Sequence, residues 1–117
     1  MLVKLMRSKI HRATVTRAAL DYEGSIGIDD ELLELSGLLP GEAVHVWNVN
    51  NGRRFETYAL PSPRGSGEIC INGAAARLAL VGDLVIVTSF CWLEREAALN
   101  HVGKVVLVNE RNQIVPK

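Results

Sequence analysis

The dipeptide Gly24-Ser25 has the clearest potential for backbone chemistry in this sequence. Glycine tolerates positive φ values and has no Cβ to shield its own carbonyl group. The Ser25 hydroxyl could therefore attack the Gly24 carbonyl carbon and convert the amide into an ester. Elimination followed by hydrolysis would then leave a pyruvoyl group at position 25. The alternative is an ordinary tight turn, because Gly-Ser pairs are common in turns and a second one, Gly65-Ser66, occurs in a loop-like segment.

A second group of candidate residues lies on the strand-like segment 53–60, where Arg54, Glu56 and Tyr58 should share one face. The guanidinium of arginine is well shaped to grip a carboxylate through two hydrogen bonds. Tyr58 should lie about 6–7 Å along the same face, so that one small substrate could contact both side chains. The alternative is that Arg54 pairs with a nearby glutamate and that Tyr58 packs at the rim of a sheet.

Two further segments could contact an anion. Lys9 and His11 are two residues apart on a strand-like segment, so both side chains should project to the same face. Asn72-Gly73 precedes a run of alanines, and backbone amides at a helix start can hold an anion where small side chains let it approach. The alternatives are a solvated strand face for the basic segment and a plain glycine turn before an alanine-rich helix.

The composition indicates one folded domain, residues 1–117, with 48% hydrophobic and 22% charged residues. The zero net charge argues against binding nucleic acid through a broad basic surface. We expect no membrane span and no signal peptide, because no apolar run is long enough. We also expect no metal site, because the three histidines lie far apart in the sequence: His11, His45 and His101. Cys70 and Cys91 are expected to be buried free thiols in a reducing cytoplasm.

The hydrophobic periodicity predicts many short strands and two or three short helices. One helix is expected over 30–36, with Asp29 as its N-cap and Gly37 at its end, and another within 94–99. Asn51-Gly52 predicts a hairpin with a type I′ turn. Strands are expected within 1–17 and at 26–28, 43–49, 53–60, 68–71, 84–90, 104–108 and 113–115. This pattern is typical of a compact β-barrel, in which the most apolar strand, 84–90, should be central.

In this order along the chain, the segments resemble the pyruvoyl-dependent aspartate 1-decarboxylase family over nearly the whole length. The resemblance rests on Lys9-Ile10-His11-Arg12, Tyr22-Glu23-Gly24-Ser25, Trp47-Asn48-Val49, Asn51-Gly52-Arg53-Arg54-Phe55, Thr57-Tyr58, Arg64-Gly65-Ser66, Asn72-Gly73-Ala74-Ala75-Ala76 and Val81-Gly82-Asp83. It implies a double-psi β-barrel that forms a cytoplasmic homotetramer, with active sites between neighbouring subunits.

The resemblance also implies an inactive proenzyme that cleaves itself between Gly24 and Ser25. The products would be a β chain of residues 1–24 and an α chain of residues 25–117 that begins with a pyruvoyl group derived from Ser25. This covalent cofactor, without a metal, condenses with the amine of L-aspartate and accepts the electrons released when the α-carboxylate leaves as CO2. The product, β-alanine, feeds pantothenate and coenzyme A synthesis. Some members of the family need a maturation factor.

Individual residues acquire expected roles from the same resemblance. Arg54 is expected to grip a substrate carboxylate, with Lys9 and His11 adding positive potential. Tyr58 is expected to protonate the carbanion, and Thr57 to stabilise the oxyanion formed during cleavage. The other expected participants are Tyr22 and Asn72 in cleavage, and Thr57, Asn72, Trp47, Gly73, Ala74, Ala75 and, more loosely, Ala76 around the substrate.

The sequence departs from the family pattern in two places, and one alternative function remains open. Gly27 stands where many relatives carry Thr or Ala, which could loosen the strand after the cleavage point, and the segment beyond Phe90 fits the family only loosely. The alternative function is that of a catalytically inactive barrel of this type that binds protein or DNA. Against it stand the zero net charge and the joint presence of Lys9, Ser25, Arg54, Tyr58 and Asn72.

Overall fold

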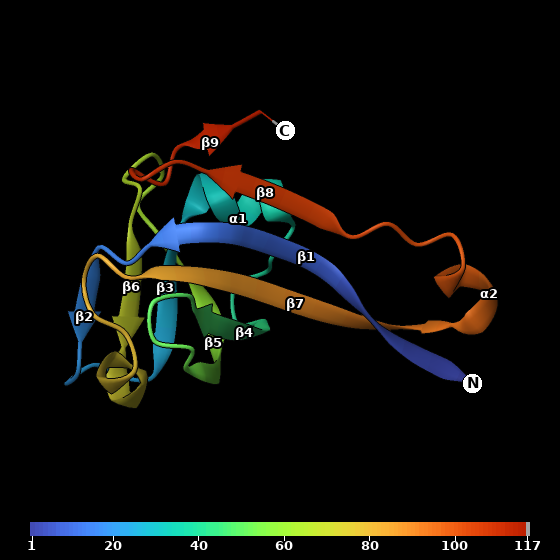
Figure 1. Cartoon of the computed structure of the whole chain (residues 1–117), viewed down its shortest axis with the longest axis horizontal. Helices are drawn as coiled ribbons and strands as arrows, with labels where there is room; N and C mark the ends of the chain where they lie inside the picture. The colour runs from blue at the N-terminus through green and yellow to red at the C-terminus, as the bar shows by residue number, and fades with distance from the viewer. Residues whose placement is uncertain (117) are drawn as a thin grey trace.

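The computed structural model describes residues 1–116 as a mainly β chain with two short α-helices (Figure 1). Its strands are β1 (Leu2–Thr14), β2 (Arg17–Ala19), β3 (Ser25–Asp29), β4 (Ala43–Asn48), β5 (Arg54–Ser62), β6 (Ile69–Asn72), β7 (Leu84–Glu94), β8 (Lys104–Val108) and β9 (Ile114–Val115). The helices are α1 (Asp30–Ser36), α2 (Arg95–Ala98) and the 3-10 helix η1 (Gly73–Arg77). The predicted double-psi β-barrel with two or three short helices is confirmed in its mainly β, barrel-like architecture.

The strands form one sheet in the order β2-β6-β3-β5-β4-β7-β1-β8-β9. Three pairs are parallel, namely β1 with β8, β2 with β6, and β3 with β5. Asn112, which precedes β9 at one end of this strand order, connects that end to the segment before β6, near the other end. Its side-chain amide donates to the carbonyl groups of Thr14 at 2.8 Å and Gly67 at 2.7 Å, and it accepts the Thr14 N–H at 2.7 Å. Because Gly67 lies just before β6, these bonds close the curved sheet on itself.

Helix α1 begins and ends at the predicted residues. The Asp29 carboxylate accepts the Glu31 N–H at 2.9 Å, and Gly37 ends the helix with a φ of 77°. Leu32 and Leu33 are buried and pack in the main core. The helix therefore begins directly where β3 ends and covers one side of that strand.

The predicted alternation along β4 is confirmed. Val44, Val46 and Asn48 are buried, whereas His45 and Trp47 are half-buried on the other side. In β3, by contrast, all five residues are buried, so both faces of the strand are covered, and β5 and β6 pair with its two edges. This strand carries Ser25 at its first position.

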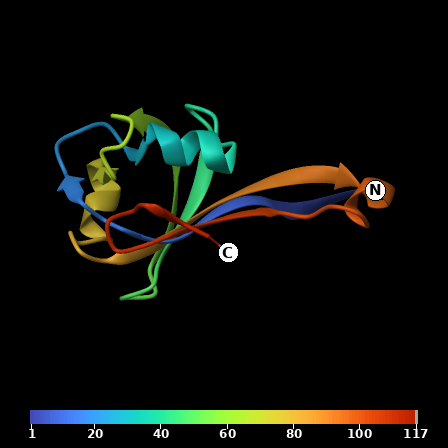
Figure 2. The ribbon, with the colours of Figure 1, turned by 90° about the horizontal axis from the view of Figure 1, so that it is seen from above.

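Strands β1 and β7 extend together beyond the barrel as a two-stranded arm, with α2 at its tip (Figure 1, Figure 2). β7 lies between β4 and β1, which confirms that it is a central strand. It runs to Glu94 rather than ending near Phe90, because Leu2 pairs with Glu94 along the arm. Cys91 is therefore half-buried on the arm, not buried in the core as expected.

Two turn regions differ from the sequence prediction. In the hairpin after β4, Gly52 has a φ of 75° but Asn51 does not have a positive φ, so the type I′ prediction is wrong. The Asn48 side chain organises this turn instead, since its oxygen accepts the Asn50 N–H at 2.9 Å. β5 continues through Pro61 to Ser62, two residues beyond the predicted strand 53–60, because parallel pairing with β3 extends that far.

No helix among residues 1–116 is both long enough and apolar enough to cross a membrane.

Asp29 also holds the loop that precedes β6. Its buried carboxylate accepts the Gly65 N–H at 3.0 Å and the Gly67 N–H at 2.8 Å, besides capping α1. Burial by itself raises the pKa of Asp29. The N–H groups of Gly67, Glu31 and Gly65 and the charge of Arg64 oppose it, and the net pKa is lowered.

We expect Asp29→Asn to lower the free energy of unfolding at neutral pH by about 2–3 kcal/mol, because a neutral amide cannot accept all three N–H groups as strongly. Urea unfolding measures the change. Asp30→Asn is the matched control, since the Asp30 side chain is half exposed in its ion pair with Arg64, and it should cost less than about 0.5 kcal/mol.

The loss of stability caused by Asp29→Asn should become smaller as the pH falls. A carboxylate whose folded pKa lies below its unfolded pKa stabilises fully above the unfolded value and loses that contribution as pH falls through the folded value. The difference between wild type and Asp29→Asn should therefore narrow in strong acid. A difference that stays constant down to the acid-unfolding range would contradict this role.

Candidate active site

Ser25 begins β3 and is 3% exposed. It pairs with Asn72 on the antiparallel strand β6, and the Asn72 side-chain amide donates to Ser25 Oγ at 3.0 Å. Ser25 Oγ in turn lies 3.4 Å from the Glu23 carbonyl oxygen, to which it donates. The hydroxyl is thus held on both sides, directly after the peptide bond that it could attack.

Gly73 lets the segment before Ser25 approach β6 closely. Gly73 has a φ of 74°, and a Cβ at this position would lie 2.8 Å from both the nitrogen and the Cα of Gly24 and 2.9 Å from the Tyr22 carbonyl oxygen. A Cβ at Gly24, by contrast, would meet no atom within 4 Å. The Gly24-Ser25 bond therefore has backbone packed against one side and open space on another.

Tyr58 lies next to Ser25 on the other flanking strand. The parallel register pairs Ile26 with Ala59, both fully buried, so the preceding residues Ser25 and Tyr58 are neighbours on the opposite face. Thr57 pairs with the buried Val44 and lies on the core face instead. Ser25, Asn72 and Tyr58, with Gly24 and Gly73, are called the cleavage cluster below.

Four other predicted residues adjoin this cluster. Tyr22 is exposed, and the Arg17 guanidinium lies 5.5 Å from the centre of its ring. Ala74, Ala75 and Ala76 follow Gly73 in η1, where Ala74 is exposed and Ala75 packs against the core. The element is a five-residue 3-10 helix rather than a longer alanine-rich helix.

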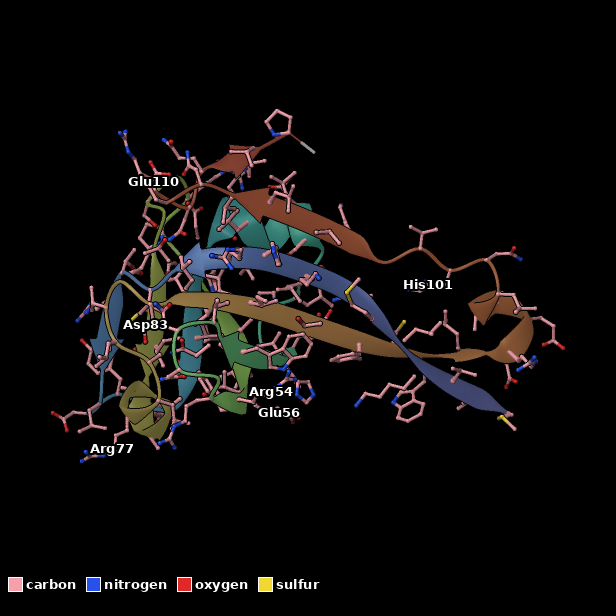
Figure 3. All side chains as sticks on the ribbon, viewed as in Figure 1. Arg54, Glu56, Arg77, Asp83, His101 and Glu110 are labelled. Atoms are coloured by element: carbon pink, nitrogen blue, oxygen red, sulfur yellow. The ribbon has the colours of Figure 1, made fainter. Side chains whose placement is uncertain are left out.

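Arg54 belongs to a separate group of residues. Its guanidinium lies 4.8 Å above the Trp47 ring on β4, and both line a pocket of about 180 Å³. On the same side of β5, the Glu56 carboxylate lies 3.3 Å from His45 Nε2. Figure 3 shows Arg54 and Glu56 close together on this side of the strand. The ion-pair alternative for Arg54 is not what the structure shows, since its neighbour is an aromatic ring.

Lys9 lies on the same outer face as Arg54. The strand register aligns Lys9, Thr88, His45 and Glu56 in one row across four adjacent strands. Lys9 is three strands away from Glu56 in this row, so Trp47 and Arg54 alone are called the basic cluster below.

His11 lies further along β1, in a pocket of about 400 Å³ that Arg12 and Glu110 also line. Its buried Nδ1 has no hydrogen-bond partner in the described chain. Burial lowers the pKa of His11, and the positive charges of Lys9 and Arg12 lower it further. The imidazole is therefore biased toward its neutral form, which weakens the positive potential expected from this residue.

The cleavage and basic clusters do not meet within one chain. Tyr58 lies four positions, about 13 Å, along β5 from Arg54, so the expected spacing of about 6–7 Å is wrong. The Arg54 guanidinium also points toward β4, which flanks β5 on the side away from β3. A single chain therefore holds two parts of the predicted site and does not bring them together.

One contact at the cleavage cluster was missed from the sequence. The thiol of Cys70 donates to the side-chain oxygen of Asn72 at 3.1 Å. The two residues are two apart on β6, so the spacing that places side chains on one face was the available signal. Residues 1–116 contain no group of three or more His, Cys, Asp or Glu side chains that could hold a metal ion.

The contact between Gly73 and Gly24 can be tested with a matched pair of substitutions. Gly73 and Gly52 have φ values of 74° and 75°, but a Cβ at Gly52 would meet nothing within 4 Å. Both alanine variants carry the same backbone strain, and Gly73→Ala should lower the free energy of unfolding by about 1–2 kcal/mol more. It should also speed chymotrypsin cleavage after Tyr22, because the 22–24 segment is pushed outward. Equal effects in both variants would contradict the packing role.

Known proteins match this chain over nearly its whole length. The family profile described as "Aspartate decarboxylase" matches residues 1–115. The aspartate 1-decarboxylase of Caldicellulosiruptor saccharolyticus is 56% identical, over 98% of this chain and 90% of its own length. That of Caulobacter vibrioides is 55% identical, over 97% of both chains. These relatives are named as enzymes and give no support to the alternative of a binding module.

The family profile spans the cleavage cluster, the basic cluster and the arm in one continuous match. The resemblance expected from the ordered motifs is therefore confirmed, and so is the enzyme class. This chain belongs to the aspartate decarboxylase family.

Proposed function

We propose that this protein converts L-aspartate and a proton into β-alanine and CO2, which supplies β-alanine for pantothenate and coenzyme A synthesis. The observation that carries the proposal is the Ser25 hydroxyl, held by Asn72 beside the open Gly24-Ser25 bond. It occurs in a chain 56% identical to an aspartate 1-decarboxylase. The substrate is taken from the names of such relatives, and the residue roles below are part of the proposal.

Ser25 would first act on its own backbone. Its Oγ attacks the Gly24 carbonyl carbon, the C–N bond breaks, and an ester replaces the amide. Loss of the Ser25 Cα proton then expels the carboxylate of residues 1–24, and water releases ammonia from the remaining dehydroalanine. Thr57 is the proposed donor to the Gly24 oxyanion, because continuing the parallel register two residues back from Ile26 and Ala59 places it beside Gly24 rather than beside Ser25. Tyr22 and Asn72 hold the segment in place.

The surroundings of position 25 fit a pyruvoyl group. Position 25 lies on one face with Asn72 and Tyr58, and the space that a Cβ on Gly24 would occupy is open. Such a group supplies a sink for the electrons that the departing carboxylate leaves behind. The Tyr58 hydroxyl would deliver a proton to the carbon that has lost the carboxylate.

The remaining proposed roles concern substrate binding. Arg54 would hold a substrate carboxylate through two hydrogen bonds, with the Lys9 ammonium adding attraction. Trp47 stacks with the Arg54 guanidinium and would limit its rotation. The backbone of Gly73, Ala74 and Ala75 would form the wall of the pocket, with Ala76, Thr57 and Asn72 at its edge, and His11 would adjust the potential near Lys9.

A second copy of the chain would complete the site. Within one chain Arg54 points away from Ser25, so the basic cluster of one subunit would serve the cleavage cluster of its neighbour. A homotetramer in the cytoplasm repeats this contact around closed symmetry. A maturation factor could act on the exposed 20–24 segment before cleavage.

Intact mass measurement of the denatured protein tests the cleavage step. We expect two fragments separated after Gly24, with the 25–117 fragment lighter by one ammonia than a chain that begins with serine. Ser25→Ala should remain one uncut chain without β-alanine formation, yet keep its oligomeric size, because the backbone fold does not depend on the hydroxyl. A cut and active Ser25→Ala protein would refute the mechanism.

Arg54→Ala tests the substrate-binding step separately. It should still cleave itself but lose roughly 100-fold in kcat/KM for aspartate, because the paired hydrogen bonds to the carboxylate are lost. Arg53→Ala, which removes the adjacent exposed arginine, is the control and should turn over aspartate normally. Normal turnover by Arg54→Ala would remove it from the site.

Co-expression of the two inactive variants tests whether subunits share the site. In mixed oligomers, about a quarter of the sites would combine an intact cleavage cluster from one chain with an intact Arg54 from the other. Activity should therefore reappear well above the level of either variant alone. No recovery in verified mixed oligomers would show that each chain carries its own complete site.

A further inference from the structure

Three side chains next to the cleavage bond form a continuous hydrogen-bonded chain. The Cys70 thiol donates to Asn72 Oδ1 at 3.1 Å, and Asn72 Nδ2 donates to Ser25 Oγ at 3.0 Å. Cys70 and Asn72 lie on the same face of β6, which pairs directly with β3 through Ser25 and Gly27. Cys70 thus contacts the reacting hydroxyl through one intermediate group.

The thiol can determine which way the Asn72 amide faces. An asparagine amide has an accepting oxygen at one end and a donating nitrogen at the other, so a half-turn exchanges them. A protonated thiol beside Oδ1 favours one arrangement, in which Nδ2 faces Ser25. Cys70 is 5% exposed, and burial, helped by the charge of Glu68, raises the pKa of its thiol, so the proton is retained at neutral pH.

Gly27 is the residue of β3 that packs against Cys70. It pairs with Cys70 across the ladder, and a Cβ at Gly27 would lie 3.4 Å from Cys70 Cβ and 2.7 Å from Ser62 Oγ. The glycine that departs from the family pattern is therefore enclosed between β5 and β6, and a larger residue would press on Ser62 and approach Cys70.

We infer that Cys70 is a positioning residue for self-cleavage, acting through Asn72 to orient the Ser25 hydroxyl toward Gly24. Cys70 does not touch the scissile bond and takes no part in bond making. The inference rests on the proposed function, because it concerns the same cleavage step. It assigns a role to a residue that the proposed function leaves unused.

The test follows the disappearance of the uncut chain after a pulse of cell-free synthesis, measured by intact mass. Cys70→Ala should slow cleavage about three- to tenfold, the effect of losing one hydrogen bond that orients the reactant. Cys70→Val, which fills the space without a donor, should be equally slow. Cys70→Ser, which restores a donor, should cleave within about twofold of wild type. Cys91→Ala is the control thiol on the arm and should cleave normally.

A double-mutant comparison separates this role from a general loss of stability. If Cys70 acts through Asn72, Cys70→Ala should slow wild type but add no further delay to Asn72→Ala. If Cys70→Ala acted only by lowering stability, it would slow cleavage in both wild type and Asn72→Ala. Cys70→Ser would then not restore the rate. Equal rates for wild type, Cys70→Ala and Cys70→Val would overturn the inference alone. A wild-type chain that stays uncut even after a cell extract containing a maturation factor is added would overturn the proposed function together with it.

Discussion

The pairing of β3 with β6 is the constraint on which the rest of the site depends. It brings Ser25 opposite Asn72 and sets Gly24 against Gly73, with no space for a Cβ on Gly73. Backbone ladders fix strand positions more firmly than side-chain contacts do, because each residue is held through its own peptide groups. A weak nucleophile can therefore be held next to one particular peptide bond by the fold itself, and side chains need only adjust its orientation.

Local signals in the sequence were sufficient for the elements that depend on local physics. Helix α1 begins at the Asp29 cap and ends at Gly37, and β4 alternates as expected, because capping and side-chain periodicity act over a few residues. One error arises where a distant segment decides, and the other where a nearby side chain outweighs the turn dipeptide. β5 extends through Pro61 because β3 pairs with it, and the turn after β4 follows the Asn48 side chain rather than the Asn-Gly pair.

The candidate site was predictable as a set of residues but not as an arrangement. Residue types and motif order pointed to Ser25, Arg54 and Tyr58, yet the sequence does not record which strand flanks which. The register shows that Ser25 lies beside Tyr58. Arg54 lies four positions earlier on β5, and its guanidinium contacts the Trp47 ring. Only three-dimensional pairing could reveal that one chain holds two separated parts. The contact of Cys70 with Asn72 was missed for a different reason, since their spacing on one strand was visible but a buried cysteine has an ordinary structural explanation.

The two ends of β3 serve different purposes and depend on each other. Ser25 stands at the first position and Asp29 at the last, where its carboxylate holds Glu31, Gly65 and Gly67 through their N–H groups. A strand of five residues has few ladder bonds to resist a shift, and a shift by one residue would turn Ser25 to the core face and Ile26 outward. The Asp29 bonds oppose that shift, because they attach the end of β3 to the loop that leads into β6. The acid that stabilises the fold therefore also maintains the register that presents Ser25 to Asn72.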